Sequence, residues 1–159
     1  MECQICQRIA QIEQGENPYF VCELSTGYVV LGDHQRFLGY TLFLCKKHIT
    51  ELHHLPWDYR TRFLQEMSLV AQAVDDVYHP DKMNYELLGN GDTHLHWHLF
   101  PRRSGDTPRP GPVWWLPPEE MWDDQFRPNP QQLSSQTEVL REAIMKRLQE
   151  LPEWGGSAE

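Results

Sequence analysis

The sequence predicts one α+β domain in which an antiparallel sheet of about five strands packs against one main helix. Two observations favour this class: five short runs of aromatic and branched apolar residues, and one longer segment with apolar residues at helical spacing. We expect residues 1–104 to form the main body of this domain. Residues 105–159 then add a Pro/Trp-rich extension and a C-terminal helix, packed on the same domain or on a dimer partner.

The strands are predicted from short apolar runs that end at turn residues. Five such runs occur, over residues 19–24, 28–31, 40–45, 83–88 and 95–100. Ser25-Thr26-Gly27 is suited to a hairpin turn between the first two runs, and Gly89-Asn90-Gly91-Asp92 to a hairpin-type connection between the last two.

The main helix is predicted to begin after Pro56, which suits a first helical turn, and to end before Pro80. Its apolar positions recur every three or four residues, at 59, 63, 67, 70, 74 and 77. Near the end of the chain, Ser135 and Glu138 fit a capping box before an apolar stripe that starts at Leu140. This pattern predicts a C-terminal amphipathic helix that begins near Ser135.

Residues 101–130 contain eight of the twelve prolines and three of the six tryptophans, Trp114, Trp115 and Trp122. Disorder is the usual interpretation of a proline-rich segment. Aromatic residues at this density instead favour packing on another part of the protein.

Charge and hydropathy exclude two classes of partner. Fourteen Lys and Arg against twenty-three Asp and Glu give a net charge of −9, which is the wrong sign for binding a nucleic-acid backbone. The longest apolar runs have four residues, far fewer than the roughly 18 that a membrane span needs. We expect a cytoplasmic protein, because Met1-Glu2-Cys3-Gln4 does not resemble a secretory signal.

Three histidines alternate along the last predicted strand, at His94, His96 and His98. Alternate residues of a strand share a face, so the three imidazoles are expected on one face. The first and third then lie about 13 Å apart, too far to bind one metal ion. An imidazole is a competent nucleophile at neutral pH, and its attack on phosphorus forms a phosphoramidate that water can cleave. The alternative is a strand that simply turns polar side chains to solvent.

The histidine run, followed by Phe100-Pro101-Arg102, resembles the signature of the histidine triad (HIT) family of nucleotide hydrolases and transferases. Further segments upstream resemble family motifs in the same order: Cys3–Cys6, Gly15–Pro18, Gly39–Leu42, Lys46–His48, Asp81–Asn84 and Leu88–Asn90. The resemblance covers residues 3–104. Two positions depart from it, because Tyr40 replaces a frequent histidine and Cys45 a frequent proline.

The resemblance implies a division of labour among the histidines. His96 would attack the α-phosphate of a bound nucleotide and become nucleotidylated. His98 would contact the phosphate and help the leaving group, while the backbone carbonyl of His94 would orient the His96 ring.

The resemblance also implies a set of nucleotide-binding residues, namely Asp33, Gly89, Asn90 and Gly91. Asp33 corresponds to the acidic residue that holds the ribose hydroxyls, and the other three to the loop that faces the phosphates. Asn90 and Asp33 are equally typical of turns without a ligand.

Four residues form a candidate metal site, namely Cys3, Cys6, His48 and His94. Two thiolates and two imidazoles are typical of a closed, structural zinc site, and equivalent positions hold zinc in some relatives. The alternative is a pair of buried thiols at the start of a helix, with a histidine held by a carbonyl. Cys22 and Cys45 lie in apolar runs and are predicted core residues. We expect no organic cofactor.

The resemblance therefore implies a homodimeric hydrolase with a catalytic domain at residues 1–104, which cleaves a phosphoanhydride or phosphoramidate of an adenine nucleotide or dinucleotide and releases AMP. Diadenosine polyphosphates are the first substrate class expected, and adenosine phosphoramidates the second. The alternatives are a transferase or phosphorylase that uses the same intermediate, a nucleotide-binding module without catalysis, and a zinc enzyme with an open metal position.

Overall fold

The computed structural model describes residues 2–156. Its helices and strands follow in this order: α1 Gln4–Glu13, β1 Phe20–Glu23, β2 Gly27–Leu31, β3 Thr41–Cys45, α2 Trp57–Tyr78, β4 Lys82–Glu86, β5 His96–Arg102, α3 Pro118–Met121 and α4 Pro130–Leu148. The strands form one antiparallel sheet in the order β1-β2-β3-β5-β4. The predicted α+β class with a five-stranded sheet and one main helix is confirmed.

The helices differ from the prediction at both ends of the chain. Helix α1 was expected only in the alternative to the metal site, which put the cysteines at the start of a helix. Ile5, Ile9 and Ile12 pack together against the sheet at helical spacing. Helix α4 begins at Pro130, so the capping box expected at Ser135 is wrong. Asn129 caps this helix instead, since its side chain accepts from the Gln132 N–H and the Gln132 side chain accepts from the Asn129 N–H.

Strands β2 and β3 are buried on both faces, because successive side chains of a strand point in opposite directions. One set packs in the cluster that includes α2 and α4; its members in these strands are Val29, Leu31, Phe43 and Cys45. The other set, Tyr28, Val30 and Leu44, packs with Ile5 of α1. Cys22 and Cys45 are buried, as predicted. The sheet therefore has two covered faces, and each needs its own partner elements.

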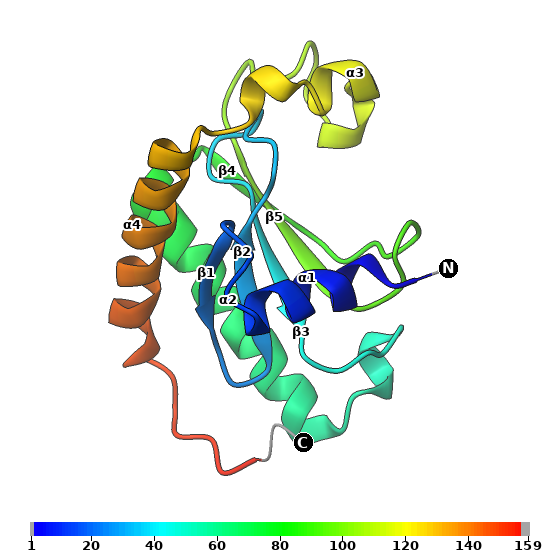
Figure 1. Ribbon diagram of the computed structural model, residues 1–159, viewed down its shortest axis with the longest axis vertical. Coiled ribbons are helices and arrows are strands. Elements are labelled where there is room, and N and C mark those ends of the chain that lie inside the picture. The colour runs from blue at the N-terminus through cyan, green and yellow to red at the C-terminus, as the bar shows by residue number, and fades with distance from the viewer. Residues whose placement is uncertain (1, 157–159) are drawn as a thin grey trace.

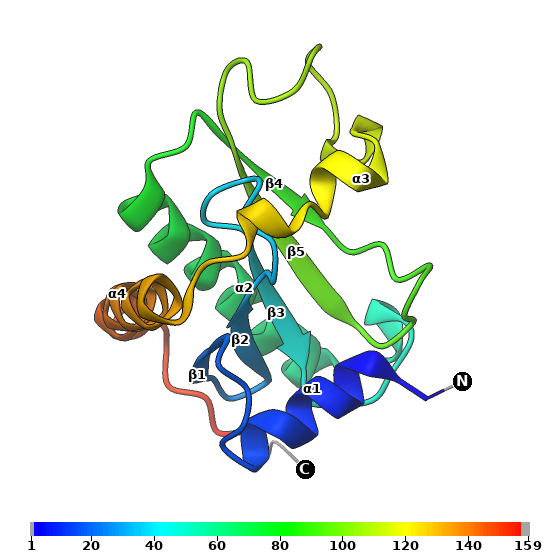
Figure 2. The same cartoon turned by 45° about the horizontal axis from the view of Figure 1, so that its top comes forward.

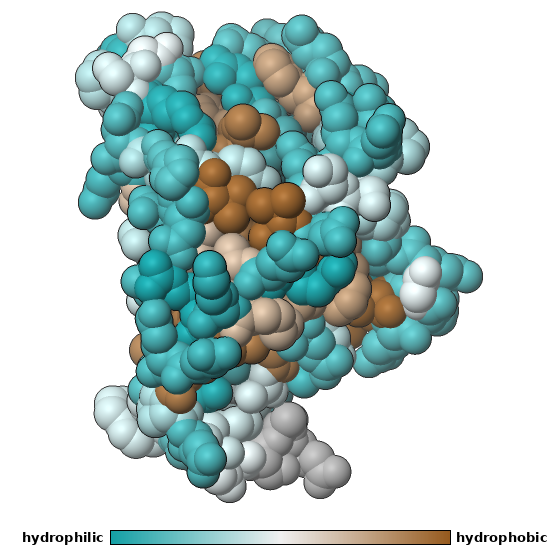
Figure 3. Space-filling view, turned by 90° about the vertical axis from the view of Figure 1, so that its left-hand side faces the viewer, coloured by the Kyte–Doolittle hydropathy of each residue, from teal (hydrophilic) through white to brown (hydrophobic). Residues whose placement is uncertain are grey.

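Helices α2 and α4 cover the first face. Figure 1 shows them side by side, and α4 also contacts β1. The surface on the α4 side is mostly hydrophilic with a hydrophobic area near its centre (Figure 3). No helix within residues 2–156 has both the length and the apolar character that crossing a bilayer requires.

The second face is covered at its two ends by different segments. Helix α1 lies over one end, and the segment that contains α3 lies over the other (Figure 2). Residues of this extension pack on the sheet side chain Phe100, and the buried members from the extension are Val113, Leu116 and Met121. The Pro/Trp-rich segment is thus folded onto the domain, and part of the sheet lies open between it and α1.

Arg102, at the end of β5, anchors the beginning of the extension. Its side chain is 10% exposed and donates to the Asp106 carboxylate at 2.8 Å, the Gly111 carbonyl at 2.7 Å and the Asn84 side chain at 2.9 Å. Burial opposes ionisation of Asp106, but bonds from Arg102 and from the Arg103 N–H outweigh it, so the pKa of Asp106 lies below its usual value. The extension is therefore held by a buried, fully bonded guanidinium.

Replacing this anchor is expected to destabilise the protein. Arg102→Met should lower the free energy of unfolding by about 3 kcal/mol, because Asp106 and the Gly111 carbonyl lose a buried charged partner. Urea denaturation followed by circular dichroism measures the change. The matched control is Arg109→Met, since Arg109 is exposed in the same segment. Equal stability of the two variants would contradict the anchoring role.

Candidate active site

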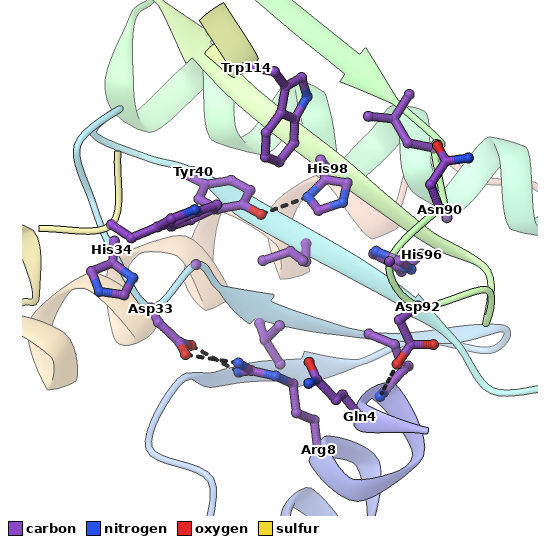
Figure 4. A pocket seen from close by; sticks show the side chains of 18 residues that line it. Gln4, Arg8, Asp33, His34, Tyr40, Asn90, Asp92, His96, His98 and Trp114 are labelled. Carbon is purple, nitrogen blue, oxygen red and sulfur yellow. Dashed lines mark hydrogen bonds and ion pairs between the residues drawn. The ribbon is translucent and has the colours of Figure 1, made fainter. Parts of the chain in front are cut away.

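A cavity of about 630 Å³ lies between α1 and the extension. This volume is within the roughly 300–1,000 Å³ of typical small-molecule sites. Its floor is the open part of the sheet, with Val30, Leu42, His96 and His98 among the lining residues. In Figure 4 the two histidines lie between the side chains of α1 and Trp114. The cavity thus lies over the part of the second sheet face that neither α1 nor the extension covers.

The residues expected to bind a nucleotide line this cavity together with the two histidines. They are Asp33, after β2, and Gly89, Asn90 and Gly91, in the connection between β4 and β5. Gly89 has a φ of +74°, in the left-handed region that glycine adopts without strain. The loop therefore turns tightly beside the cavity.

His96 is held by one short bond to the main chain. Its Nδ1 lies 2.6 Å from the carbonyl oxygen of His94. Because a carbonyl only accepts, Nδ1 must carry the hydrogen, and Nε2 of the neutral ring keeps a free lone pair. The ring is 7% exposed and lines the cavity, so this nitrogen is a suitable nucleophile.

His98 is held by Tyr40, whose hydroxyl lies 2.6 Å from His98 Nδ1. Burial, and then the proximity of His96, lower the pKa of His98 to about 4. Burial raises the pKa of Tyr40 well above its usual value, so the hydroxyl stays protonated. It can therefore donate a hydrogen bond to His98 Nδ1. This arrangement leaves the hydrogen on His98 Nε2, which then serves as a donor beside His96.

His94 is separated from the other two histidines. The expectation that all three rings share one face is wrong, because β5 begins at His96 and the ring of His94 is almost fully buried, at 1% exposure. Its Nε2 lies 2.7 Å from the Cys45 carbonyl, so this nitrogen carries the hydrogen. Burial lowers the pKa of His94, and Nδ1 of the neutral ring has a free lone pair.

That lone pair faces the candidate metal ligands Cys3, Cys6 and His48, and the ligand atoms of all four residues lie within 4.8 Å of one another. His94 Nδ1 is 3.5 Å from each sulfur and 3.2 Å from His48 Nδ1. Zinc bonds of about 2.0–2.3 Å in a tetrahedron place ligand atoms about 3.3–3.8 Å apart. The four residues fit zinc. The thiols do lie at the start of α1, but Cys6 is exposed rather than buried.

Asp92 connects the candidate metal site with the cavity, and sequence reasoning gave it no role. Its carboxylate accepts from Ile5 N–H at 3.2 Å, from His94 N–H at 3.1 Å and from the Cys3 thiol at 3.5 Å. Burial opposes its ionisation, but the backbone donors outweigh it, so the pKa of Asp92 lies below its usual value. The only hint in the sequence was its place after Gly91.

Arg8 and Asp33 close the α1 side of the cavity. Two parallel bonds of 2.9 and 2.8 Å join the guanidinium to the carboxylate. These bonds and the charge of Arg8 outweigh burial and hold the pKa of Asp33 below its usual value. No signal in the sequence pointed to Arg8, because its partner Asp33 lies 25 residues away along the chain. The extension contributes Trp114 and Trp122 to the opposite side, and the density of tryptophan was their only sequence signal.

Comparison with known proteins identifies a HIT domain over residues 16–105. No curated protein matches the chain. A histidine triad protein from Marinobacter aquaeolei VT8 has 25% identity, with 92% of this chain and 98% of that chain covered and a TM-score of 0.71. A histidine triad protein from Bradyrhizobium japonicum has 24% identity, 79% and 89% coverage and a TM-score of 0.68. A Zn-bound histidine triad family protein from Mycobacterium smegmatis has 22% identity, 95% and 99% coverage and a TM-score of 0.63.

The lowered pKa of His98 predicts a pH dependence of stability. An unfolded chain takes up a proton at His98 near pH 6.5, whereas the folded protein does so near pH 4. The contribution of His98 to the free energy of unfolding should therefore fall as the pH drops from about 6.5 to about 4. Ring NMR signals of His98, assigned with the variant His98→Asn, should titrate with a midpoint near 4. A midpoint near 6.5 would contradict the effect of burial.

Proposed function

The chain belongs to the HIT domain family, and from that membership we propose that it is a nucleotide hydrolase that uses His96 as its nucleophile. The proposed reaction cleaves a phosphoanhydride or phosphoramidate at the α-phosphate of an adenine nucleotide or dinucleotide and releases AMP. The observation that carries the proposal is the 2.6 Å bond between His96 Nδ1 and the His94 carbonyl. This bond leaves Nε2 without a hydrogen in a cavity large enough for a nucleotide.

In the first step, His96 Nε2 attacks the α-phosphorus and forms a P–N bond. The bond from phosphorus to the leaving group breaks, and the leaving group takes the electron pair. The positive charge that develops on the His96 ring is stabilised by the His94 carbonyl through Nδ1–H. His98 Nε2–H donates a hydrogen bond to the phosphate or to the leaving-group atom.

In the second step, a water oxygen attacks the same phosphorus. The P–N bond breaks, and its electron pair returns to His96 Nε2. The products are AMP and the free enzyme. An amine leaving group takes one proton from solvent in the first step, and the attacking water returns one proton to solvent in the second. If another acceptor replaces water, the same intermediate supports a transferase or a phosphorylase.

The nucleoside is proposed to bind on the α1 side. Arg8 keeps the Asp33 carboxylate ionised and in place. The carboxylate lone pairs that do not face Arg8 can accept hydrogen bonds from the ribose hydroxyls. The loop of Gly89, Asn90 and Gly91 then faces the phosphates, where the Asn90 amide is a suitable donor.

We also propose that Cys3, Cys6, His48 and His94 hold a structural zinc ion. The supporting observation is the donor set, in which His94 Nδ1 has its lone pair directed at two thiols and a second imidazole. The ion would cross-link the start of α1 to β5, the strand that carries His96. Four protein donors make a closed site, which disfavours the alternative of a hydrolytic zinc ion with an open position.

Two further expectations remain predictions. A homodimer is supported by the position of β4 at the edge of the sheet, with Tyr85 exposed on it and Leu88 exposed after it. The cytoplasmic location rests on the sequence.

The test of catalysis compares the wild type with His96→Ala. With diadenosine tetraphosphate or an adenosine phosphoramidate, AMP release should fall about a thousandfold or more in the variant, because no other side chain replaces the nucleophile. Quenched-flow mass spectrometry of the wild type should detect AMP bound to a His96 peptide. His53→Ala is the matched control, since His53 is exposed, and it should keep the wild-type rate. Tight AMP binding by a wild type that releases no AMP would instead support a binding module.

The test of the metal compares His48→Ala with His54→Ala. The wild type and His54→Ala should contain about one zinc per chain, and His48→Ala much less. Loss of the ion should lower the free energy of unfolding by about 4 kcal/mol, the value for a ligand near a thousand times its Kd. Metal analysis and urea denaturation measure the two effects. If a chelator abolished AMP release while the protein stayed fully folded, a purely structural role of the zinc ion would be wrong. A catalytic metal ion would then be indicated.

A further inference from the structure

Trp114 and Trp122 line the active-site cavity, although both lie outside the HIT domain match at residues 16–105. We propose that these two side chains form an aromatic subsite for the leaving group of the reaction. The protein then selects nucleotides whose leaving group carries a ring, such as a second base or an arylalkyl amine. This inference rests on the proposed function, because it takes His98 as the residue beside the leaving group.

The first argument is the position of Trp114 next to His98. Their ring centroids are 5.8 Å apart with an interplanar angle of 85°. Trp114 makes the same kind of edge contact with Phe100, at 5.8 Å and 89°. A leaving group that extends past His98, away from α1, therefore meets the indole (Figure 4).

The second argument is that the indole of Trp114 is fixed. Its Nε1–H donates to the Glu86 carboxylate at 2.8 Å, and Glu86 pairs with His98 across β4 and β5. The side chain is nevertheless 39% exposed, which leaves ring surface free for a ligand. A fixed, partly open aromatic ring binds another ring without first losing side-chain entropy.

Trp122 extends this surface. Its ring lies 6.1 Å from that of Trp114 at 51°, and 5.6 Å from His34 at 64°. The two indoles are too close to hold a ring between them, since that needs about 7 Å, twice the carbon–carbon contact distance. A ligand ring must therefore lie against their open faces. Trp122 is 41% exposed, so such a face exists.

The backbone that carries both tryptophans is tied down at several points. Arg36 donates to the Asp106 carbonyl at 2.9 Å and to the Glu120 carboxylate at 3.1 Å. Arg102 holds the Gly111 carbonyl. These bonds lie before Trp114 and between the two tryptophans, so the aromatic surface is present before a ligand arrives.

The two ends of the cavity differ in chemistry. The α1 end offers Ile5, Val30 and the Arg8–Asp33 ion pair, which suit a nucleoside with its ribose hydroxyls. The extension end offers two indoles. With His96 and His98 between these ends, the two substituents of the α-phosphate are directed to opposite ends of the cavity.

The experiment uses three adenosine 5′-phosphoramidates that differ only in the leaving amine: methylamine, 2-cyclohexylethylamine and 2-phenylethylamine. For the wild type, kcat/KM should be about tenfold higher for the phenylethyl than for the methyl compound, as expected for one ring stacked on an indole, with the cyclohexyl compound between them. Trp114→Leu should reduce this ratio to near one. Trp114→Phe keeps an aromatic ring and should retain a clear preference.

The matched control is Trp115→Leu. Trp115 follows Trp114 directly but does not line the cavity, and its ring packs on Arg109 at 4.4 Å. This variant should keep the wild-type ratio. Thermal unfolding checks that each variant is folded. The ratio of kcat/KM for the phenylethyl and methyl compounds is measured within one variant, so it does not depend on the fraction of active protein.

Three outcomes would overturn the subsite. A wild type with equal kcat/KM for the methyl and phenylethyl compounds has no aromatic selection. A Trp114→Leu variant that loses activity on both compounds by the same factor shows that the indole only supports His98. A wild type that releases AMP from none of the three compounds overturns the proposed function itself, and the subsite with it.

Discussion

His94 makes the contacts on which the rest of the site depends. Its carbonyl oxygen accepts from His96 Nδ1, and its own Nε2–H donates to the Cys45 carbonyl of the neighbouring strand. Each bond fixes one tautomer, so His96 Nε2 and His94 Nδ1 both keep a lone pair. The first lone pair belongs to a ring in the cavity and the second faces the cysteines. His94 therefore directs one lone pair into the cavity and the other to the candidate metal ligands, although His94 and His96 are only two positions apart.

Helix α1 couples these two places. Cys3 and Cys6 lie at its first turn beside His94, whereas Arg8, one turn further, holds Asp33 at the cavity. Asp92 joins the same first turn to the loop that faces the cavity, through the Ile5 N–H. The same helix therefore carries both the candidate metal ligands and the Arg8–Asp33 ion pair of the cavity.

The opposite side of the cavity depends on the extension, which explains why a proline-rich segment is ordered. Its apolar side chains are buried on Phe37, Tyr40 and Phe100, and its polar backbone groups are bonded by buried arginines such as Arg102. The same packing that stabilises the segment also brings Trp114 to His98. Stability and the shape of the cavity therefore have a common origin here.

Features that depend on neighbours along the chain could be predicted from the amino-acid sequence alone. Short apolar runs bounded by turn residues predicted the sheet, and helical spacing predicted α2. The His94, His96 and His98 pattern with Cys3 and Cys6 indicated the candidate residues. Three features became visible only in the folded chain: His94 turns away from the cavity, Tyr40 holds His98 from 58 residues away, and Trp114 lies beside His98 at one end of the cavity. Local periodicity and turn chemistry act over a few residues, whereas these contacts arise from the way distant segments pack, which no local pattern encodes.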